Sequence, residues 1–324
     1  MLTSLLILIF ISAATNIGDV SKSLTAENLA DVIKVETTSF PEVHQAEVGN
    51  SNVPLEEFKN LPKSVAEKTP EPPLSWSHAG VVVDAESGKV LYGKDEKKKM
   101  PLASLTKMMT AIIIDERISD WNEEVYISKE AAFAGGAAVH LKWDERVRAG
   151  DLFKAMLMNS DNSAAIALSE HIAGSKDKFV EMMNQKSQEI GALDTHFTDP
   201  SGLEDENSFS TAYDMARITQ YALKKEKIVE VMQTKGPIEI KSCDGNIVHR
   251  VGNTNVFLKD DNLVNRVICG KTGFTYKAGY NLMMSMYDKE KKRKAIGVIL
   301  NSDDKMRWEE MEEMIEWSFN NYTW

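Results

Sequence analysis

Several features on which whole classes of protein depend are scarce in this sequence. Only two cysteines occur among the 324 residues, so no framework of disulfides holds the fold together. Cys243 and Cys269 form either one bridge or two unpaired thiols. The net charge of −11 argues against a nucleic-acid binder, which needs a basic surface. Apolar runs stay far below the roughly 20 residues of a membrane span, which excludes a multi-spanning membrane protein.

The motifs of the commonest catalytic sites are also missing. The sequence contains no G-x-S-x-G, H-E-x-x-H, C-x-x-C, G-x-G-x-x-G or Walker pattern. Its six histidines are scattered, and none stands at ligand spacing from a second histidine or a cysteine. A serine triad built on histidine therefore has no support, and we expect structural or solvated histidines.

The first 14 residues carry no charged side chain and include an unbroken apolar run over residues 5–11. The small residues Ser12, Ala13 and Ala14 follow it, which is typical of the apolar core and cleavage site of a secretory signal. No lysine or arginine precedes the run, so an uncleaved N-terminal anchor is the alternative, and a buried strand is a weaker one. We expect an exported protein whose hold on a membrane, if it has one, comes from this end.

Residues 15–75 are acidic and rich in proline. They contain five lysines against ten acidic residues, six of the nine prolines, and neither tryptophan nor tyrosine. Such a composition buries too little apolar surface to offset the entropy of ordering a chain. The sequence therefore predicts a leader over residues 1–14, a flexible acidic tether over 15–75 and one catalytic domain over 76–324.

Residues 76–324 show an ordered succession of strand and helix patterns. A hairpin is expected from strands at 78–84 and 90–92, followed by a helix over 104–114. Further helices are expected over 151–159, 162–172, 176–190 and 211–224, and strands over 238–241, 247–251, 263–269, 279–287 and 294–300. A closing helix covers 306–319. The order predicts an α/β fold of the α+β type, in which both ends of the domain build an antiparallel sheet and a helical lobe is inserted between them.

The first chemical motif is the pair Ser104 and Lys107. A serine and a lysine three apart on a helix share one face, and a neutral lysine amine can accept the hydroxyl proton without any histidine. The first turn of a helix also favours developing negative charge. The same S-x-x-K spacing recurs at Ser175 and at Ser302, but in polar, lysine-rich segments, whereas Ser104 opens an apolar helix.

Two further motifs follow. Ser160 and Asn162 stand two apart between helical segments, where they either reach into a cleft or simply cap a helix. Lys271, Thr272 and Gly273 form the K-T-G sequence, expected at the end of the strand over 263–269. There a lysine and a threonine could hold a carboxylate beside a glycine that allows close approach, unless the segment is a plain turn.

The three motifs occur in the order known from penicillin-binding proteins and class A β-lactamases. Beyond them, residues 76–324 resemble the D-alanyl-D-alanine carboxypeptidases among the low-molecular-mass penicillin-binding proteins. The matching blocks are DAESGKVLY, PLASLTKMMT, FVEMMN, THFTDPSGL, STAYD and GKTGFT. The resemblance implies a β-lactamase/DD-peptidase-like fold, no metal or cofactor, stem peptides ending in D-Ala-D-Ala as substrate, and β-lactams as covalent inhibitors.

The resemblance also implies roles for single residues. Ser104 is the acylated nucleophile, Lys107 the base that activates it, and Ser160 the relay that carries a proton to the leaving D-alanine. Asn162 binds the substrate amide, and Lys271 and Thr272 hold the terminal carboxylate. The backbone N–H groups of Ser104 and Phe274 form the oxyanion hole. Burial and the positive Lys271 are both expected to lower the pKa of Lys107.

The sequence departs from this family in places, and other functions compete. Thr254 lies between two asparagines where some relatives carry arginine, and Ser201 stands where relatives often have histidine. A class A β-lactamase would need an E-x-x-L-N sequence after Asn162, and the chain reads EIGALD instead. A DD-endopeptidase that cuts peptidoglycan crosslinks remains open, since the sequence offers no discriminator. A penicillin-sensing receptor would need several membrane spans, and a non-catalytic wall binder would not need all three motifs.

Overall fold

The computed structural model describes residues 61–65, 74–136 and 139–323. The predicted leader and most of the predicted tether lie outside these residues. The described strands are β1 (Lys63–Ser64), β2 (Ala79–Asp84), β3 (Val90–Lys94), β4 (Glu124–Tyr126), β5 (Arg146–Arg148), β6 (Ile238–Lys241), β7 (Val248–Val251), β8 (Val267–Thr275), β9 (Gly279–Tyr287), β10 (Lys294–Ser302) and β11 (Tyr322–Thr323). The helices are α2 (Lys107–Arg117), α3 (Lys129–Ala132), α4 (Ala149–Met158), α5 (Asn162–Ala173), α6 (Lys176–Ile190), α7 (Ala212–Ala222), α8 (Glu226–Met232) and α9 (Met306–Asn321), with 3₁₀ turns η2 (Ala103–Thr106) and η3 (Val256–Lys259).

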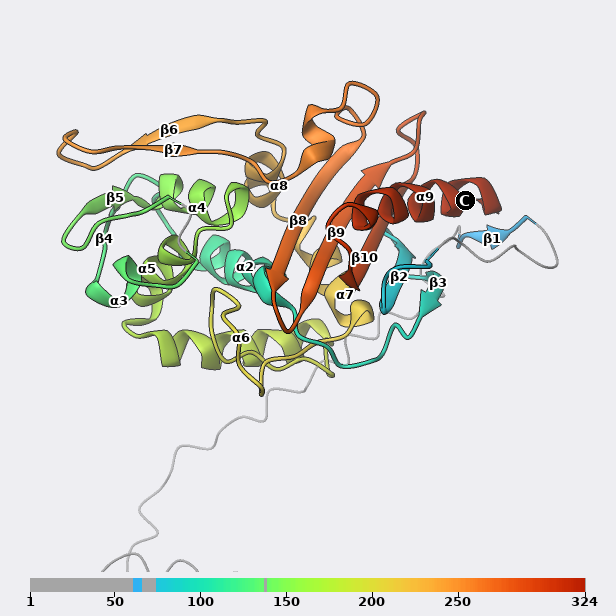
Figure 1. The fold of residues 1–324 in the computed structure, drawn as a ribbon, viewed down its shortest axis with the longest axis horizontal. Helices are drawn as coiled ribbons and strands as arrows, with labels where there is room; N and C mark the ends of the chain where they lie inside the picture. The colour runs from blue at the N-terminus through green and yellow to red at the C-terminus, as the bar shows by residue number, and fades with distance from the viewer. Residues whose placement is uncertain (1–60, 66–73, 137–138, 324) are drawn as a thin grey trace, which may run out of the picture. The chain divides into compact units, whose positions relative to one another are not determined.

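An antiparallel sheet of five strands forms the centre of the fold, in the order β3-β2-β10-β9-β8 (Figure 1). The early strand β2 pairs with β3 on one side and with the late strand β10 on the other, so both ends of the predicted domain build the same sheet. This confirms the predicted architecture, with the helices α2 to α8 inserted between the two halves. β8 is an edge strand, and this position leaves one side of its backbone unpaired with any other strand of the sheet.

The sheet is covered on both faces because its strands alternate between two apolar cores. Val81 and Val83 of β2 face one core together with Val298 of β10, while Val82 faces the other. The first core contains the buried side of α2, α4, α5 and α7, and the second contains the buried side of α9. Figure 1 shows α9 lying across the sheet strands. Period-two burial of this kind is expected for strands packed between two layers.

The helical lobe packs around α2, whose residues from Lys107 to Ile114 are all buried. A helix that is buried on all sides over two turns belongs in the middle of a bundle rather than on its surface. α4, α5, α6, α7 and α8 contact it. The predicted helices and hairpins of this region are confirmed, whereas β4, β5, α3 and α8 were not predicted, because these elements span only three to seven residues and show little periodicity.

One prediction about the sheet was wrong. An apolar strand was expected over 263–269 with Lys271 to Gly273 at its end, but β8 begins at Val267 and continues to Thr275. Leu263 and Val264 lie instead in a turn, where their N–H groups donate to the Asp260 carbonyl. The K-T-G residues are therefore held inside the ladder by pairing with β9, which fixes their side chains more firmly than a strand end would.

Three further observations complete the fold. Cys243 and Cys269 are free thiols, and burial raises the pKa of Cys269 to about 12. Part of the segment predicted as tether is paired, since β1 lies antiparallel to β11. Among the helices of the described residues, none combines the length and the apolar character needed to cross a bilayer.

Candidate active site

Ser104 lies in η2, one turn before α2, and its side chain faces Lys107. The Lys107 Nζ–Ser104 Oγ distance is 2.9 Å, so the contact expected from the three-residue spacing is present. The backbone of Ala103, immediately before the serine, has a φ of 50°. Such a conformation is costly for a residue with a Cβ and is found where surrounding structure enforces it, often at functional sites.

Lys107 is completely buried, and its amine has three oxygen neighbours. Besides Ser104 Oγ, Nζ donates to Asn162 Oδ1 at 2.5 Å and to the Ser201 carbonyl at 2.6 Å. Burial lowers the pKa of Lys107 to about 7, against the opposing effect of Asp161 and Asp199. The predicted effect of burial is confirmed. Lys271 is not among the charges that shift the pKa of Lys107. Instead, the charge of Lys107 lowers the pKa of Lys271.

These neighbours determine what a neutral Lys107 can do. A neutral amine has two N–H groups and one lone pair. Asn162 Oδ1 and the Ser201 carbonyl can only accept hydrogen bonds, so they take the two N–H groups. The lone pair is then left for the Ser104 hydroxyl. The arrangement can therefore draw the proton from Ser104 Oγ without a third side chain.

The turn between α4 and α5 presents Ser160 and Asn162 to the same site. Ser160 has a φ of 61°, which breaks the helical path between the two helices. The capping alternative applies to the residue between them: Asp161 caps α5 by accepting from the Ala164 N–H, and its other oxygen accepts from the Val139 N–H. Asn162 is held on both sides, since its Nδ2 donates to the Gly135 carbonyl.

β8 brings the third motif against the other two. Lys271 is buried, and its Nζ donates to Ser160 Oγ at 2.8 Å and to the Thr272 carbonyl at 2.9 Å. Burial, Lys107 and Arg307 all lower the pKa of Lys271, in that order of importance. Thr272 Oγ1 contacts Thr254 Oγ1 at 2.9 Å, so Thr254 contributes a hydroxyl beside this part of the site.

Two glycines allow the parts of the site to approach one another. A Cβ on Gly273 would lie 2.8 Å from the Leu102 carbonyl oxygen and 3.2 Å from the Ser104 nitrogen. Only glycine therefore lets β8 come this close to η2. Gly202 has a φ of 79°, and a Cβ there would lie 2.0 Å from the Ala103 carbonyl oxygen. This close packing keeps the preceding Ser201 carbonyl against Lys107.

Arg307 is a member of the site that the sequence analysis missed. It lies in the first turn of α9, is 8% exposed, and lines the same cavity as Ser104. Its guanidinium stacks over Tyr280 at 4.9 Å and donates to Asp304 Oδ1, while its Nε has no partner within the described residues. No local motif marks this arginine, and only the packing of α9 on the sheet brings it to the cavity.

The predicted residues meet at one cavity of about 250 Å³. It is lined by Ser104, Gly136, Asn159, Ser160, Asn162, Thr272, Gly273, Phe274 and Arg307. Lys107 and Lys271 lie behind these residues, each bonded to a serine of the cavity. No group of three or more histidine, cysteine or acidic side chains in the described residues could hold a metal ion.

Comparison with known proteins agrees with this geometry. The family model described as D-alanyl-D-alanine carboxypeptidase, peptidase S11, matches residues 66–304. The D-alanyl-D-alanine carboxypeptidase DacF of Bacillus subtilis is 32% identical over 249 residues, which cover 75% of this chain and 62% of that protein. A D-alanyl-D-alanine endopeptidase of Haemophilus influenzae is 31% identical over 65% of this chain and 71% of its own length.

A solved structure is similar over most of the fold. Penicillin binding protein 6B of Escherichia coli superposes with a TM-score of 0.69 and 30% identity, covering 81% of this chain and 83% of that one. The chain thus spans less than two thirds of the length of the B. subtilis relative, but the match includes the sheet, the helical lobe and all three motifs. With the family model covering most of its length, the chain belongs to the D-alanyl-D-alanine carboxypeptidase family.

Proposed function

We propose that the protein is a serine-type D-Ala-D-Ala carboxypeptidase that removes the terminal D-alanine of peptidoglycan stem peptides through an acyl-enzyme. The observation that carries the proposal is the contact of Ser104 with a fully buried lysine. Lys107 lies 2.9 Å from Ser104 Oγ, and its pKa of about 7 leaves much of it neutral near neutral pH. A base with such a pKa is well matched to proton transfer at that pH.

In acylation, Ser104 Oγ attacks the carbonyl carbon of the penultimate D-alanine and its proton passes to Lys107. The N–H groups of Ser104 and Phe274 stabilise the oxyanion. Collapse of the intermediate breaks the peptide bond, and the leaving nitrogen receives a proton through Ser160. A water molecule then attacks the ester carbonyl, gives up a proton through the same groups, and releases the shortened peptide with Ser104 restored.

The substrate carboxylate is placed at the opposite side of the cavity from Lys107. Lys271 and Thr272 hold it, and Arg307 adds a third donor group, with an Nε that has no partner among the described residues. Asn162 binds the substrate amide, which requires its Nδ2 to exchange the Gly135 carbonyl for the substrate oxygen.

The compartment in which the reaction takes place follows from the substrate. Peptidoglycan lies outside the cytoplasmic membrane, so the proposal includes export, with residues 1–14 as leader or anchor, 15–75 as tether and 76–324 as catalytic domain. A β-lactam, whose ring carbonyl and carboxylate occupy the same positions as those of D-Ala-D-Ala, acylates Ser104. The name of the similar E. coli structure, penicillin binding protein 6B, supports this part of the proposal.

The test is covalent labelling with a fluorescent penicillin. Wild type should be labelled and should release D-alanine from a pentapeptide ending in D-Ala-D-Ala, and Ser104→Ala should do neither. Ser175→Ala is the matched control, because Ser175 has the same spacing to a lysine but caps the exposed start of α6. Label that persists in Ser104→Ala, with a cooperative melting curve for that variant, would show that Ser104 is not the acylated nucleophile.

A DD-endopeptidase is the second candidate, supported by the relative from H. influenzae that carries this name. Both reactions use the same acyl-enzyme and differ in the group that leaves. Incubation with a crosslinked dimer separates them: release of monomers at a rate comparable with D-alanine release from pentapeptide would favour the endopeptidase.

A further inference from the structure

The loop between α6 and α7 contains a buried carboxylate that the proposed mechanism does not use. Asp199 is 8% exposed, and its Oδ1 accepts hydrogen bonds from the Ser201 N–H at 2.7 Å, the Ser201 hydroxyl at 2.5 Å and the Gly202 N–H at 3.1 Å. A further N–H, that of Leu203, lies at 3.4 Å. One oxygen atom therefore gathers four donors of a tight turn, which fixes the backbone of that turn.

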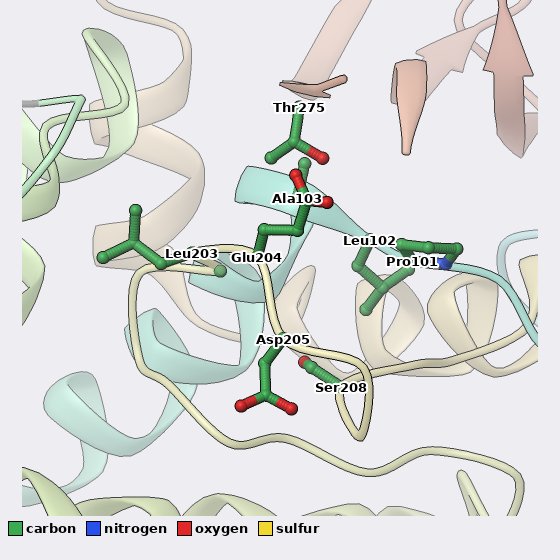
Figure 2. Close-up of a pocket in the computed structure, with 9 residues that line it drawn as sticks. Pro101, Leu102, Ala103, Leu203, Glu204, Asp205, Ser208 and Thr275 are labelled. Atoms are coloured by element: carbon green, nitrogen blue, oxygen red, sulfur yellow. The ribbon is translucent and has the colours of Figure 1, made fainter. Parts of the chain in front are cut away.

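The same turn lies against the start of α2 and the residues before it. Ser201, whose N–H and hydroxyl bind Asp199, accepts a hydrogen bond from Lys107 Nζ at 2.6 Å through its carbonyl. Gly202 packs closely on the Ala103 carbonyl, and both residues line the small pocket shown in Figure 2. One residue thus connects the buried carboxylate to the buried amine.

The direction of the Ser201 carbonyl decides where the lone pair of a neutral Lys107 points. The amine has two N–H groups, of which Asn162 Oδ1 takes one and the Ser201 carbonyl takes the other. Asn162 is held separately, by its bond to the Gly135 carbonyl. If the Ser201 carbonyl turned away, an N–H group would be free to rotate toward Ser104 Oγ. The lone pair would then no longer face the hydroxyl proton.

The charges around Lys107 give a second connection. Asp161 approaches from the turn before α5 and Asp199 from the loop before α7, and both raise the pKa of Lys107 against the larger effect of burial. On the side of β8 the neighbouring cation is Lys271, whose pKa the charge of Lys107 lowers. Behind Asp199, Lys176 Nζ lies 4.0 Å from its Oδ2. Asp199 therefore acts on Lys107 through its charge as well as through the turn.

We propose that Asp199 is a positioning residue for the base Lys107. Its carboxylate directs the Ser201 carbonyl, and with it the lone pair of the amine, toward the Ser104 hydroxyl. Its negative charge stabilises the ammonium that forms when the amine takes the hydroxyl proton. In that transfer the Ser104 O–H bond breaks and an N–H bond forms on Lys107, while Asp199 neither gains nor loses a proton. The inference rests on the proposed function, since that function makes Lys107 the base.

Two substitutions separate the two effects, with the rate of acylation by a fluorescent penicillin measured from pH 5 to 9. Asp199→Asn keeps the oxygen that holds the turn but removes the charge that favours the ammonium. The midpoint of its acid limb should therefore fall by about half a pH unit, with a plateau rate within about twofold of wild type. Asp199→Ala also loses the turn's acceptor, so its plateau should fall about tenfold, because a misaligned base transfers the proton poorly.

Asp205→Asn is the matched control. Asp205 lies in the same loop, and its Oδ1 accepts from the N–H of Asn207 two residues on, as Asp199 does from Ser201. Asp205 is exposed, and Figure 2 shows its carboxylate pointing away from Ala103. This variant should match wild type in both the midpoint and the plateau.

An unchanged midpoint in Asp199→Asn, or an equal shift in Asp205→Asn, would overturn the inference. A wild-type plateau in Asp199→Ala would do the same. A variant that lacks a cooperative melting transition is replaced by Asp199→Glu, which keeps the charge but displaces the carboxylate by one methylene. Its plateau should fall while its midpoint stays, and a wild-type plateau would again contradict the positioning role. Failure of the proposed function is distinguishable, since wild type would then not be labelled at any pH.

Discussion

Two lysines reach the active site from opposite sides, and comparing them shows how one residue type is given two tasks. Both are buried, and both donate to a serine of the cavity. Lys107 comes from the helical lobe and has two carboxylates nearby, Asp161 and Asp199. Lys271 comes from the sheet, and the charges that affect it are the cations Lys107 and Arg307.

The difference between the neighbouring charges gives the two lysines different chemical properties. Around Lys107 the carboxylates limit the fall in pKa that burial causes, so this amine can both release and accept a proton near neutral pH. Around Lys271 the positive neighbours add to the effect of burial. An incoming carboxylate relieves this repulsion and favours the charged form of Lys271. We infer that Lys107 is suited to a base and Lys271 to an anion receptor.

The largest effect is expected for Lys107→Met, which keeps a long side chain but removes the base. The rate of acylation by a fluorescent penicillin should fall about 10³-fold, within the range for general bases. Lys178→Met is the matched control, since Lys178 has the same spacing to Ser175 but is exposed on α6. Equal rates for Lys107→Met and Lys178→Met would mean that Lys107 is not the base.

A smaller effect, about 10²-fold in kcat/KM, is expected for Lys271→Met with a peptide ending in D-Ala-D-Ala, because a charged hydrogen bond to the carboxylate is lost. The rise in KM should account for most of it. A peptide ending in D-Ala-D-Ala amide lacks that carboxylate, so the variant and wild type should differ much less with it. The same loss with both peptides would contradict the role of anion receptor.

Within one pH unit of the pKa, the smallest effect is the pH dependence of acylation. Because the base form of Lys107 is needed and its pKa is about 7, kcat/KM should be level above that pH. Below it the rate should fall about tenfold per pH unit, as the fraction of neutral amine does. Stopped-flow labelling from pH 5 to 9 measures this limb. A rate that stays constant down to pH 5 would remove Lys107 from the proton transfer.

Sequence patterns predicted most of the fold, because long periodic segments carry their own signal. The helices from α4 to α7 and the strands β9 and β10 were expected close to their observed bounds. β8 was placed too early, since an apolar run before it suggested a strand and the glycine of the K-T-G segment suggested an end. Pairing with β9 overrides that local preference.

The site was only partly visible in the sequence. Ser104, Lys107, Ser160 and Lys271 were found through motifs, and the structure brings them together. Arg307 has no motif and reaches the cavity only through the packing of α9. The Ser201 carbonyl is likewise hidden, because backbone groups carry no sequence signature. Its position depends on how closely Gly202 packs against η2, which only coordinates reveal.

The edge position of β8 has a consequence for the protein's behaviour in a crowded compartment. An unpaired strand edge is a template on which other chains can aggregate, and proteins usually shield it. Here its first half is covered by α8, and Gln233 donates to the Val267 carbonyl. The remaining half lies beside the cavity, close to η2 through Gly273. The packing of α8 and η2 against β8 thereby limits the access of a second sheet to this edge.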